Sequence, residues 1–203
     1  MVKSMTVGKF LVAGVLVALV AGCFDEPTPA EQTVAKEARV YLSEKGLKDL
    51  SSVTFAAADK MDYLNLDRNE LTNVNEVASI KGLKWLRLNN NQLSKLPQLS
   101  GLTKLRRIYL KNNRFDKVPE ELKDLPDLTD IDLSGNPITE IPDWLAKKEG
   151  LENLSFSRTQ ITKLPEDLTA WKNLLSLQLG DLKLSAAEMA RIRAALPGVA
   201  IIF

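Results

Sequence analysis

The stretch from Leu83 to Pro97 decides the fold; it reads LKWLRLNNNQLSKLP. Its residues follow the pattern L-x-x-L-x-L-x-x-N-x-L-x-x-L-P, with Asn91 at the asparagine position. Leu86, Arg87 and Leu88 alternate with the period of two that is typical of a strand, so this segment cannot be one face of a helix. A short strand and a polar turn cannot bury five leucines alone, so the stretch needs copies on both sides.

Those copies are present before and after the stretch. Aligned on Leu86, equivalent apolar residues recur every 22 or 23 residues, at Leu64, Leu86, Ile108, Ile131, Leu154 and Leu177. Over residues 61–184 this signature resembles the leucine-rich repeat family, whose period is about 20 to 29 residues. The resemblance implies an α/β solenoid, with about six repeats stacked into a curved parallel sheet.

The turn of each copy has one position that is polar in most repeats: Asn69, Asn91, Asn113, Asn136, Thr159 and Leu182. An amide donates and accepts at once, so we expect the asparagines to satisfy backbone groups of their own turn and of the neighbouring copy. The outer halves begin at prolines in four copies and predict short 3₁₀ or helical turns. Trp144 and Trp171 fall in these segments, and we interpret both as core residues.

Both ends of the array read as caps. Residues 29–60 predict an N-terminal cap, with a helix that starts at Thr28 and Pro29 and ends at Gly46. Its apolar face would hold Val34, Ala38, Tyr41 and Leu42. Residues 185–203 predict a C-terminal cap, in which a Ser185–Glu188 capping box starts a helix and Val199–Phe203 forms a final strand.

The first 22 residues read as a lipoprotein signal peptide. Lys3 and Lys9 precede an apolar run at residues 10–20, which is too short to span a bilayer as a helix. The run ends in Val-Ala-Gly and then Cys23, the only cysteine of the chain, which resembles the lipobox of bacterial lipoproteins. That resemblance implies cleavage before Cys23, lipid on its sulfur, and a tether at residues 23–28.

The alternative is an ordinary secretory peptide that is cut after Ala21. In Gram-negative lipoproteins an aspartate directly after the cysteine retains the protein at the inner membrane, and Phe24 stands there instead. The resemblance therefore implies the bacterial cell envelope, with the outer membrane favoured over the inner membrane. Removal of residues 1–22 takes away Lys3 and Lys9, which leaves 25 basic against 26 acidic side chains. This balance does not favour nucleic acid as a partner.

Composition gives little support to catalysis. The chain has no histidine, which excludes Ser-His-Asp and Cys-His arrangements and removes the most common zinc ligand. Asp130 and Asp132 lie two apart and lack the dense carboxylates of a cation loop. We therefore expect no catalytic residues, no metal site and no cofactor beyond the lipid on Cys23.

Function is expected on the concave face of the sheet, where side chains alternate with the buried leucines. The predicted partner-binding residues form an aromatic and basic patch with an acidic strip beside it: Tyr63, Trp85, Arg87, Arg107, Tyr109, Lys111, Asp130 and Asp132. Trp, Tyr and Arg are the residues enriched at binding hot spots. A monomer that binds a protein partner through this patch is the leading hypothesis.

Two alternatives stay open at this point. Arg107 and Asp130 could simply pair across neighbouring strands, which would leave a structural envelope scaffold with a solvated face. An enzyme is the more remote alternative.

Overall fold

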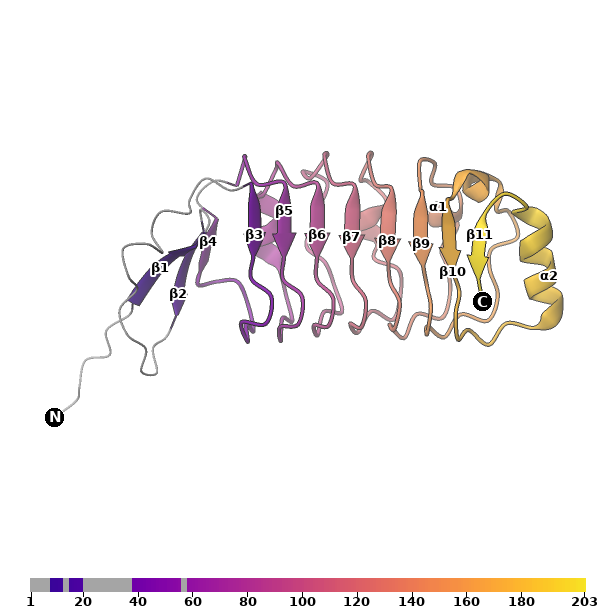
Figure 1. Ribbon diagram of the computed structural model, residues 1–203, viewed down its shortest axis with the longest axis horizontal. Helices are drawn as coiled ribbons and strands as arrows, with labels where there is room; N and C mark the ends of the chain where they lie inside the picture. The colour runs from indigo at the N-terminus through magenta and orange to yellow at the C-terminus, as the bar shows by residue number, and fades with distance from the viewer. Residues whose placement is uncertain (1–7, 13–14, 20–37, 56–57) are drawn as a thin grey trace.

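The computed structural model describes residues 8–12, 15–19, 38–55 and 58–203 (Figure 1). Eight strands form one sheet in the order β11-β10-β9-β8-β7-β6-β5-β3, and every neighbouring pair is parallel. The strands are β3 (Arg39–Tyr41), β5 (Tyr63–Asn65), β6 (Trp85–Arg87), β7 (Arg107–Tyr109), β8 (Asp130–Asp132), β9 (Asn153–Ser155), β10 (Ser176–Gln178) and β11 (Ala200–Ile202). The predicted parallel solenoid is confirmed.

The central residue of each strand is an apolar side chain that faces the core. Leu64 pairs with Leu86, and the same register continues along the sheet through Ile108 to Leu177. These side chains are at most 2% exposed. The hydrophobic core is therefore one continuous column that runs the length of the array.

Short helical segments return the chain behind the sheet in Figure 1. They are η2 (Asn75–Ser79), η3 (Glu120–Leu122), α1 (Asp143–Ala146) and η4 (Thr169–Asn173). Trp171 in η4 is fully buried, as predicted, and its indole N–H donates to the Leu145 carbonyl at 3.0 Å. Trp144 in α1 is only half-buried, because its indole N–H reaches out to the Glu120 carboxylate at 2.8 Å.

The buried asparagine amides join successive repeats in one repeated geometry. Asn91 Oδ1 accepts from the backbone N–H of Leu71 in the preceding repeat at 3.1 Å. Its Nδ2 donates to the carbonyls of Leu66, Leu88 and Asn89 at 3.0 to 3.2 Å. Asn69, Asn113 and Asn136 make equivalent contacts. Three-residue strands supply few ladder bonds, so these amides fix the register of the stack.

The predicted N-terminal helix is wrong where the structure describes it. Residues 39–41 form strand β3, which pairs in parallel with β5, while residues 28–37 of the predicted helix lie outside the described residues. Val40 is fully buried and its neighbours Arg39 and Tyr41 are exposed, which is the period-two pattern of a repeat strand.

The turn after β3 also matches the repeats that follow. Glu44 has a φ of 58°, and Arg68 and Asn90 at the equivalent positions have 57° and 56°. Leu47 occupies the buried turn position, and its N–H donates to Asn69 Oδ1 at 3.1 Å. Residues 39–50 therefore form another repeat rather than a helical cap.

A second, smaller sheet lies at the N-terminal end of the described chain (Figure 1). It consists of β1 (Gly8–Val12), β2 (Val15–Leu19) and β4 (Val53–Phe55), and β2 is antiparallel to both of the others. β1 and β2 fall within the predicted signal peptide, so cleavage before Cys23 would remove both strands from β4. Among the described residues, no helix is long and apolar enough to cross a membrane.

At the C-terminal end, α2 (Ala186–Ala195) follows the last repeat, and β11 extends the sheet beyond β10. Ser185 accepts from the N–H of Glu188 at 3.1 Å, but Glu188 does not complete the predicted capping box. Its carboxylate instead accepts from Leu164 N–H at 2.8 Å and from the Arg191 guanidinium at 2.8 and 2.9 Å. These bonds, led by the one to Arg191, lower the pKa of Glu188 and tie α2 to the repeat before it.

The buried asparagine amides should contribute measurably to stability. Asn91→Ala leaves the buried N–H of Leu71 without an acceptor and removes one of the two donors to each of the Leu66, Leu88 and Asn89 carbonyls, so we expect the free energy of unfolding to fall by about 2 kcal/mol. Urea unfolding followed by circular dichroism measures this change. Asn73→Ala, at an exposed position, is the control and should change stability by less than about 0.5 kcal/mol. Equal effects of the two variants would contradict the structural role of the amide.

Candidate functional site

The parallel register places residues of successive strands in rows across the concave face, which is the face opposite the helical segments. One row contains Arg39, Tyr63, Trp85, Arg107 and Asp130, each paired with the next. The second row contains Tyr41, Asn65, Arg87, Tyr109 and Asp132. The structure thus brings together most of the predicted patch, because the parallel register pairs each variable position with its counterpart in the next repeat.

Four aromatic side chains of these rows contact one another in sequence. The rings of Tyr41 and Tyr63 lie 5.2 Å apart between centroids and are tilted by 45°. Tyr63 meets Trp85 edge-on at 5.0 Å and 89°, and Trp85 meets Tyr109 edge-on at 5.8 Å and 85°. Edge-to-face pairs at these separations are attractive, so each ring restrains the next.

Three arginines lie over the faces of these rings. The guanidinium carbon of Arg107 is 5.2 Å from the centroid of Trp85, that of Arg87 is 5.7 Å from Tyr109, and that of Arg39 is 5.9 Å from Tyr63. All are within the range of cation–π attraction. We call the seven residues the aromatic–arginine ladder: Arg39, Tyr41, Tyr63, Trp85, Arg87, Arg107 and Tyr109.

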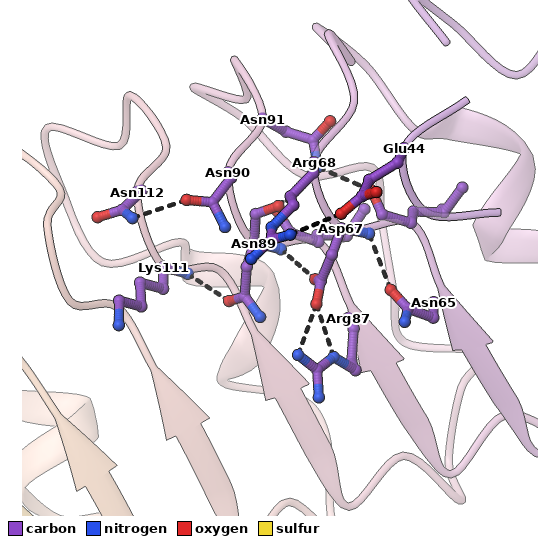
Figure 2. A network of polar contacts seen from close by, with 12 residues as sticks. Glu44, Asn65, Asp67, Arg68, Arg87, Asn89, Asn90, Asn91, Lys111 and Asn112 are labelled. Carbon is purple, nitrogen blue, oxygen red and sulfur yellow. Dashed lines mark hydrogen bonds and ion pairs between the residues drawn. The ribbon is translucent and has the colours of Figure 1, made fainter. Parts of the chain in front are cut away.

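Arg87 is held by an ion pair with the preceding repeat, as Figure 2 shows. Its Nε and Nη2 atoms donate to Asp67 Oδ2 at 2.7 and 2.6 Å. The other oxygen of Asp67 accepts from the backbone N–H of Asn89 at 2.8 Å, and Asp67 is only 7% exposed. Burial alone would lower the pKa of Arg87, but the hydrogen bond that it donates to Asp67 and the negative charge of that carboxylate together raise the pKa above its ordinary value.

Arg107 is held much less firmly than Arg87. Its Nε lies 3.7 Å from Asp130 Oδ2, which is too long for a hydrogen bond, and its side chain is 47% exposed. The two oxygens of Asp130 already accept from Thr129 Oγ1 at 2.5 Å and from Asn153 Nδ2 at 2.9 Å. Arg107 and Asp130 therefore attract one another without satisfying the donors of the arginine.

The predicted acidic strip is largely engaged within the protein. Asp130 is buried, and Asp132 Oδ1 accepts from the backbone N–H and the hydroxyl of Ser134 at 2.9 and 2.5 Å. Lys111 is half-buried at the end of the patch, and its backbone N–H donates to Asn89 Oδ1 at 2.9 Å (Figure 2). Within the described ranges, no group of three His, Cys, Asp or Glu side chains is placed to hold a metal ion.

The hydroxyls of Tyr63 and Tyr109 remain neutral at ordinary pH. Burial raises the pKa of Tyr63 and of Tyr109, and the carboxylate of Asp130 raises that of Tyr109 further. The phenols thus present hydrogen-bonding groups rather than negative charge beside the arginines.

Two buried polar atoms near the ladder are unpaired within the described part of the chain. They are the indole Nε1 of Trp85 and Oδ1 of Asp62. An unmade hydrogen bond at a buried atom costs about 1–3 kcal/mol, so both atoms lower the local stability of the fold.

Sequence reasoning missed Arg39 and Tyr41, which extend the ladder by one strand. Tyr41 is 50% exposed and is the most accessible of the four rings. The alternation Arg39-Val40-Tyr41-Leu42 was the available signal, but the nearby helix-start residues favoured a helix instead.

Arg87 with Asp67 and Arg68 with Glu44 are ion pairs that differ in solvent exposure, so we expect them to contribute differently to stability. A double-mutant cycle on Asp67→Ala and Arg87→Ala should give a coupling of about 1–2 kcal/mol, because Nε and Nη2 of Arg87 both donate to Oδ2 of Asp67 and the pair is partly buried. Arg68 and Glu44 form a similar pair at 2.6 Å, but their side chains are 69% and 61% exposed. Urea unfolding of the matching alanine variants should show a smaller coupling there. A larger coupling at the exposed pair would contradict this assignment.

Comparison with known proteins agrees with this geometry. A family model described as leucine rich repeat matches residues 38–93 and 81–138, and so includes the repeat that contains β3. None of the curated proteins compared with this chain matches it significantly.

An internalin and YopM are among the solved structures that share the fold. An internalin (InlF) from Listeria monocytogenes has a TM-score of 0.58 at 22% identity, over 71% of this chain and 48% of the internalin. YopM from Yersinia enterocolitica has a TM-score of 0.58 at 27% identity, over 74% of this chain and 30% of YopM. This chain therefore aligns with less than half the length of either protein. The matched residues and the repeat geometry together identify the chain as a leucine-rich repeat protein.

Proposed function

We propose that this chain binds a protein partner through the aromatic–arginine ladder, while lipid on Cys23 holds it at a membrane of the bacterial cell envelope. The observation that carries the first part is the ladder itself: four contacting rings and three arginines on a sheet face that points away from the helical segments (Figure 1).

The residue types of the ladder suit protein binding. Tyrosine, tryptophan and arginine dominate binding hot spots, because each buries a large area with few rotatable bonds. Here the rings already restrain one another, and Asp67 fixes Arg87. A partner therefore loses little of its binding free energy to ordering these side chains. The leucine-rich repeat fold supports the same conclusion, because its repeats build extended concave surfaces for macromolecules.

A structural scaffold is the second candidate, and one observation favours it. Arg87 is paired with Asp67, and Arg107 lies near Asp130, so part of the patch charge is balanced within the protein. The scaffold would need no partner on this face. Enzyme activity has no comparable support, and we propose none.

The partner-binding proposal and the scaffold proposal predict different results when residues of the aromatic–arginine ladder are replaced: only the first predicts a loss of crosslinked partner proteins. In the triple variant Trp85→Ala, Arg87→Ala and Tyr109→Ala, we expect crosslinked partner proteins from intact cells to fall at least tenfold against wild type, because truncated hot spots cost about 2 kcal/mol or more each. Quantitative mass spectrometry measures the captured proteins, and circular dichroism verifies the fold.

The control variant changes the other end of the same face, with Ser176→Ala and Gln178→Ala. These residues lie in the same two rows but outside the ladder. Identical captured proteins for wild type and triple variant would refute the ladder proposal and favour the scaffold.

The anchor rests on the sequence around Cys23, which lies outside the described residues. A lipobox-like end to an apolar run, together with the only cysteine of the chain, supports cleavage and lipid attachment there. Two or more acyl chains give stable membrane attachment at about 0.8 kcal/mol per buried methylene. Phe24 in place of aspartate supports the outer membrane over the inner membrane.

Replacement of the cysteine tests the anchor. Cys23→Ser should shift the protein from the membrane to the soluble fraction, and the mature chain should lose the mass of the acyl groups. Cell fractionation and intact-protein mass spectrometry measure both changes. An unchanged mature mass together with continued membrane fractionation would refute the lipoprotein proposal.

A further inference from the structure

A groove of about 250 Å³ lies beside the ladder, where the strands of the large sheet begin. Four basic side chains line it against two acidic ones, so its charge is positive although the chain as a whole is close to neutral. The lining residues used below are Asp62, Lys84, Trp85, Arg106 and Arg107.

The basic side chains that line the groove have N–H donors without a hydrogen-bond acceptor among the described residues. Within the described part of the chain, the side chains of Lys84, Arg106 and Arg107 make no hydrogen bond to protein. Lys84 lies 3.9 Å from Asp62, and Arg107 lies 3.7 Å from Asp130, whose oxygens already accept from Thr129 and Asn153. Arg107 is therefore held over Trp85 by stacking, with its N–H groups open to an external acceptor.

Arg87 provides the internal contrast. It lies over Tyr109 in the same way, but Asp67 takes two of its N–H groups at 2.6 and 2.7 Å. Of these two stacked arginines, Arg107 is thus the one equipped to bind an anion.

The lining of the groove indicates what else the ligand offers. Lys84, Arg106 and Arg107 line it with N–H donors that need acceptors. Peptide backbone supplies a carbonyl acceptor and an N–H donor in every residue. A cationic ligand fits poorly, because arginines already cover the ring faces of Tyr63, Trp85 and Tyr109.

We propose that the groove binds an acidic peptide segment of the partner, and that Arg107, flanked by Lys84 and Arg106, receives its carboxylate. This inference rests on the proposed function, since it assigns the chemistry of the segment that the concave face takes. Arg87 acts there as a positioning residue that holds Tyr109 beside Trp85.

The test uses the full-length chain and two fluorescein-labelled peptides. One peptide alternates glutamate with glycine, and its neutral twin has glutamine in place of every glutamate. Fluorescence anisotropy at low salt should show binding of the acidic peptide at least about tenfold tighter than its twin, which corresponds to one charge-assisted hydrogen bond. Added salt should reduce this preference.

Two matched variants identify the residue responsible. Arg107→Gln should remove most of the preference for the acidic peptide, while Arg114→Gln, at an exposed position outside the groove, should leave it unchanged. Equal binding of the two peptides, or a preference that survives Arg107→Gln, would overturn the proposal. Tighter binding of a single-stranded oligothymidylate than of the acidic peptide would overturn it as well.

The experiments distinguish failure of the acidic-peptide proposal from failure of the proposal that the concave face binds a protein. If the triple ladder variant loses its crosslinked partners while the acidic peptide shows no preference, the concave face binds protein by apolar contact and the carboxylate assignment is wrong.

Discussion

A buried amide links each turn of the central repeats to the turn before it, and much of the structure depends on that link. The strands are three residues long, and such strands offer few backbone bonds to resist slippage. Asn91 bonds the Leu71 N–H of one repeat and three carbonyls shared between two repeats, with geometry that a slip in register would break. Because register is fixed, each variable residue lies directly beside its counterpart in the next repeat.

The surface chemistry follows from this register. Tyr63 and Trp85 are register partners and meet edge-on, and Trp85 meets Tyr109 edge-on across the diagonal between neighbouring strands. An arginine placed one repeat later then lies over the tryptophan face. A ladder of this kind is preorganised by the core, and Tyr63 is itself largely buried.

Leucine spacing alone predicted the sheet, the buried column and the asparagine geometry, because these depend on residue type and period. It failed at Arg39–Tyr41, where Lys45 stands at the position that is asparagine in the next repeat and so hides the motif. A capping sequence just upstream pointed to a helix instead. The unequal pairing of Arg87 and Arg107 could not be predicted either, since it depends on whether Asp67 or Asp130 has an oxygen free.

The bond between Asp67 and Arg87 crosses from one repeat to the next, and so does the approach of Arg107 to Asp130. Inside the protein every repeat is nearly equivalent, and a leucine from one would fit the next. On the concave face the repeats are not interchangeable. Loss of residues 83–104, one whole period, would leave the core continuous but place Asp67 beside Tyr109 instead of Arg87. Changes in array length by duplication or deletion are therefore constrained by neighbouring charges on the surface rather than by the packing of the solenoid.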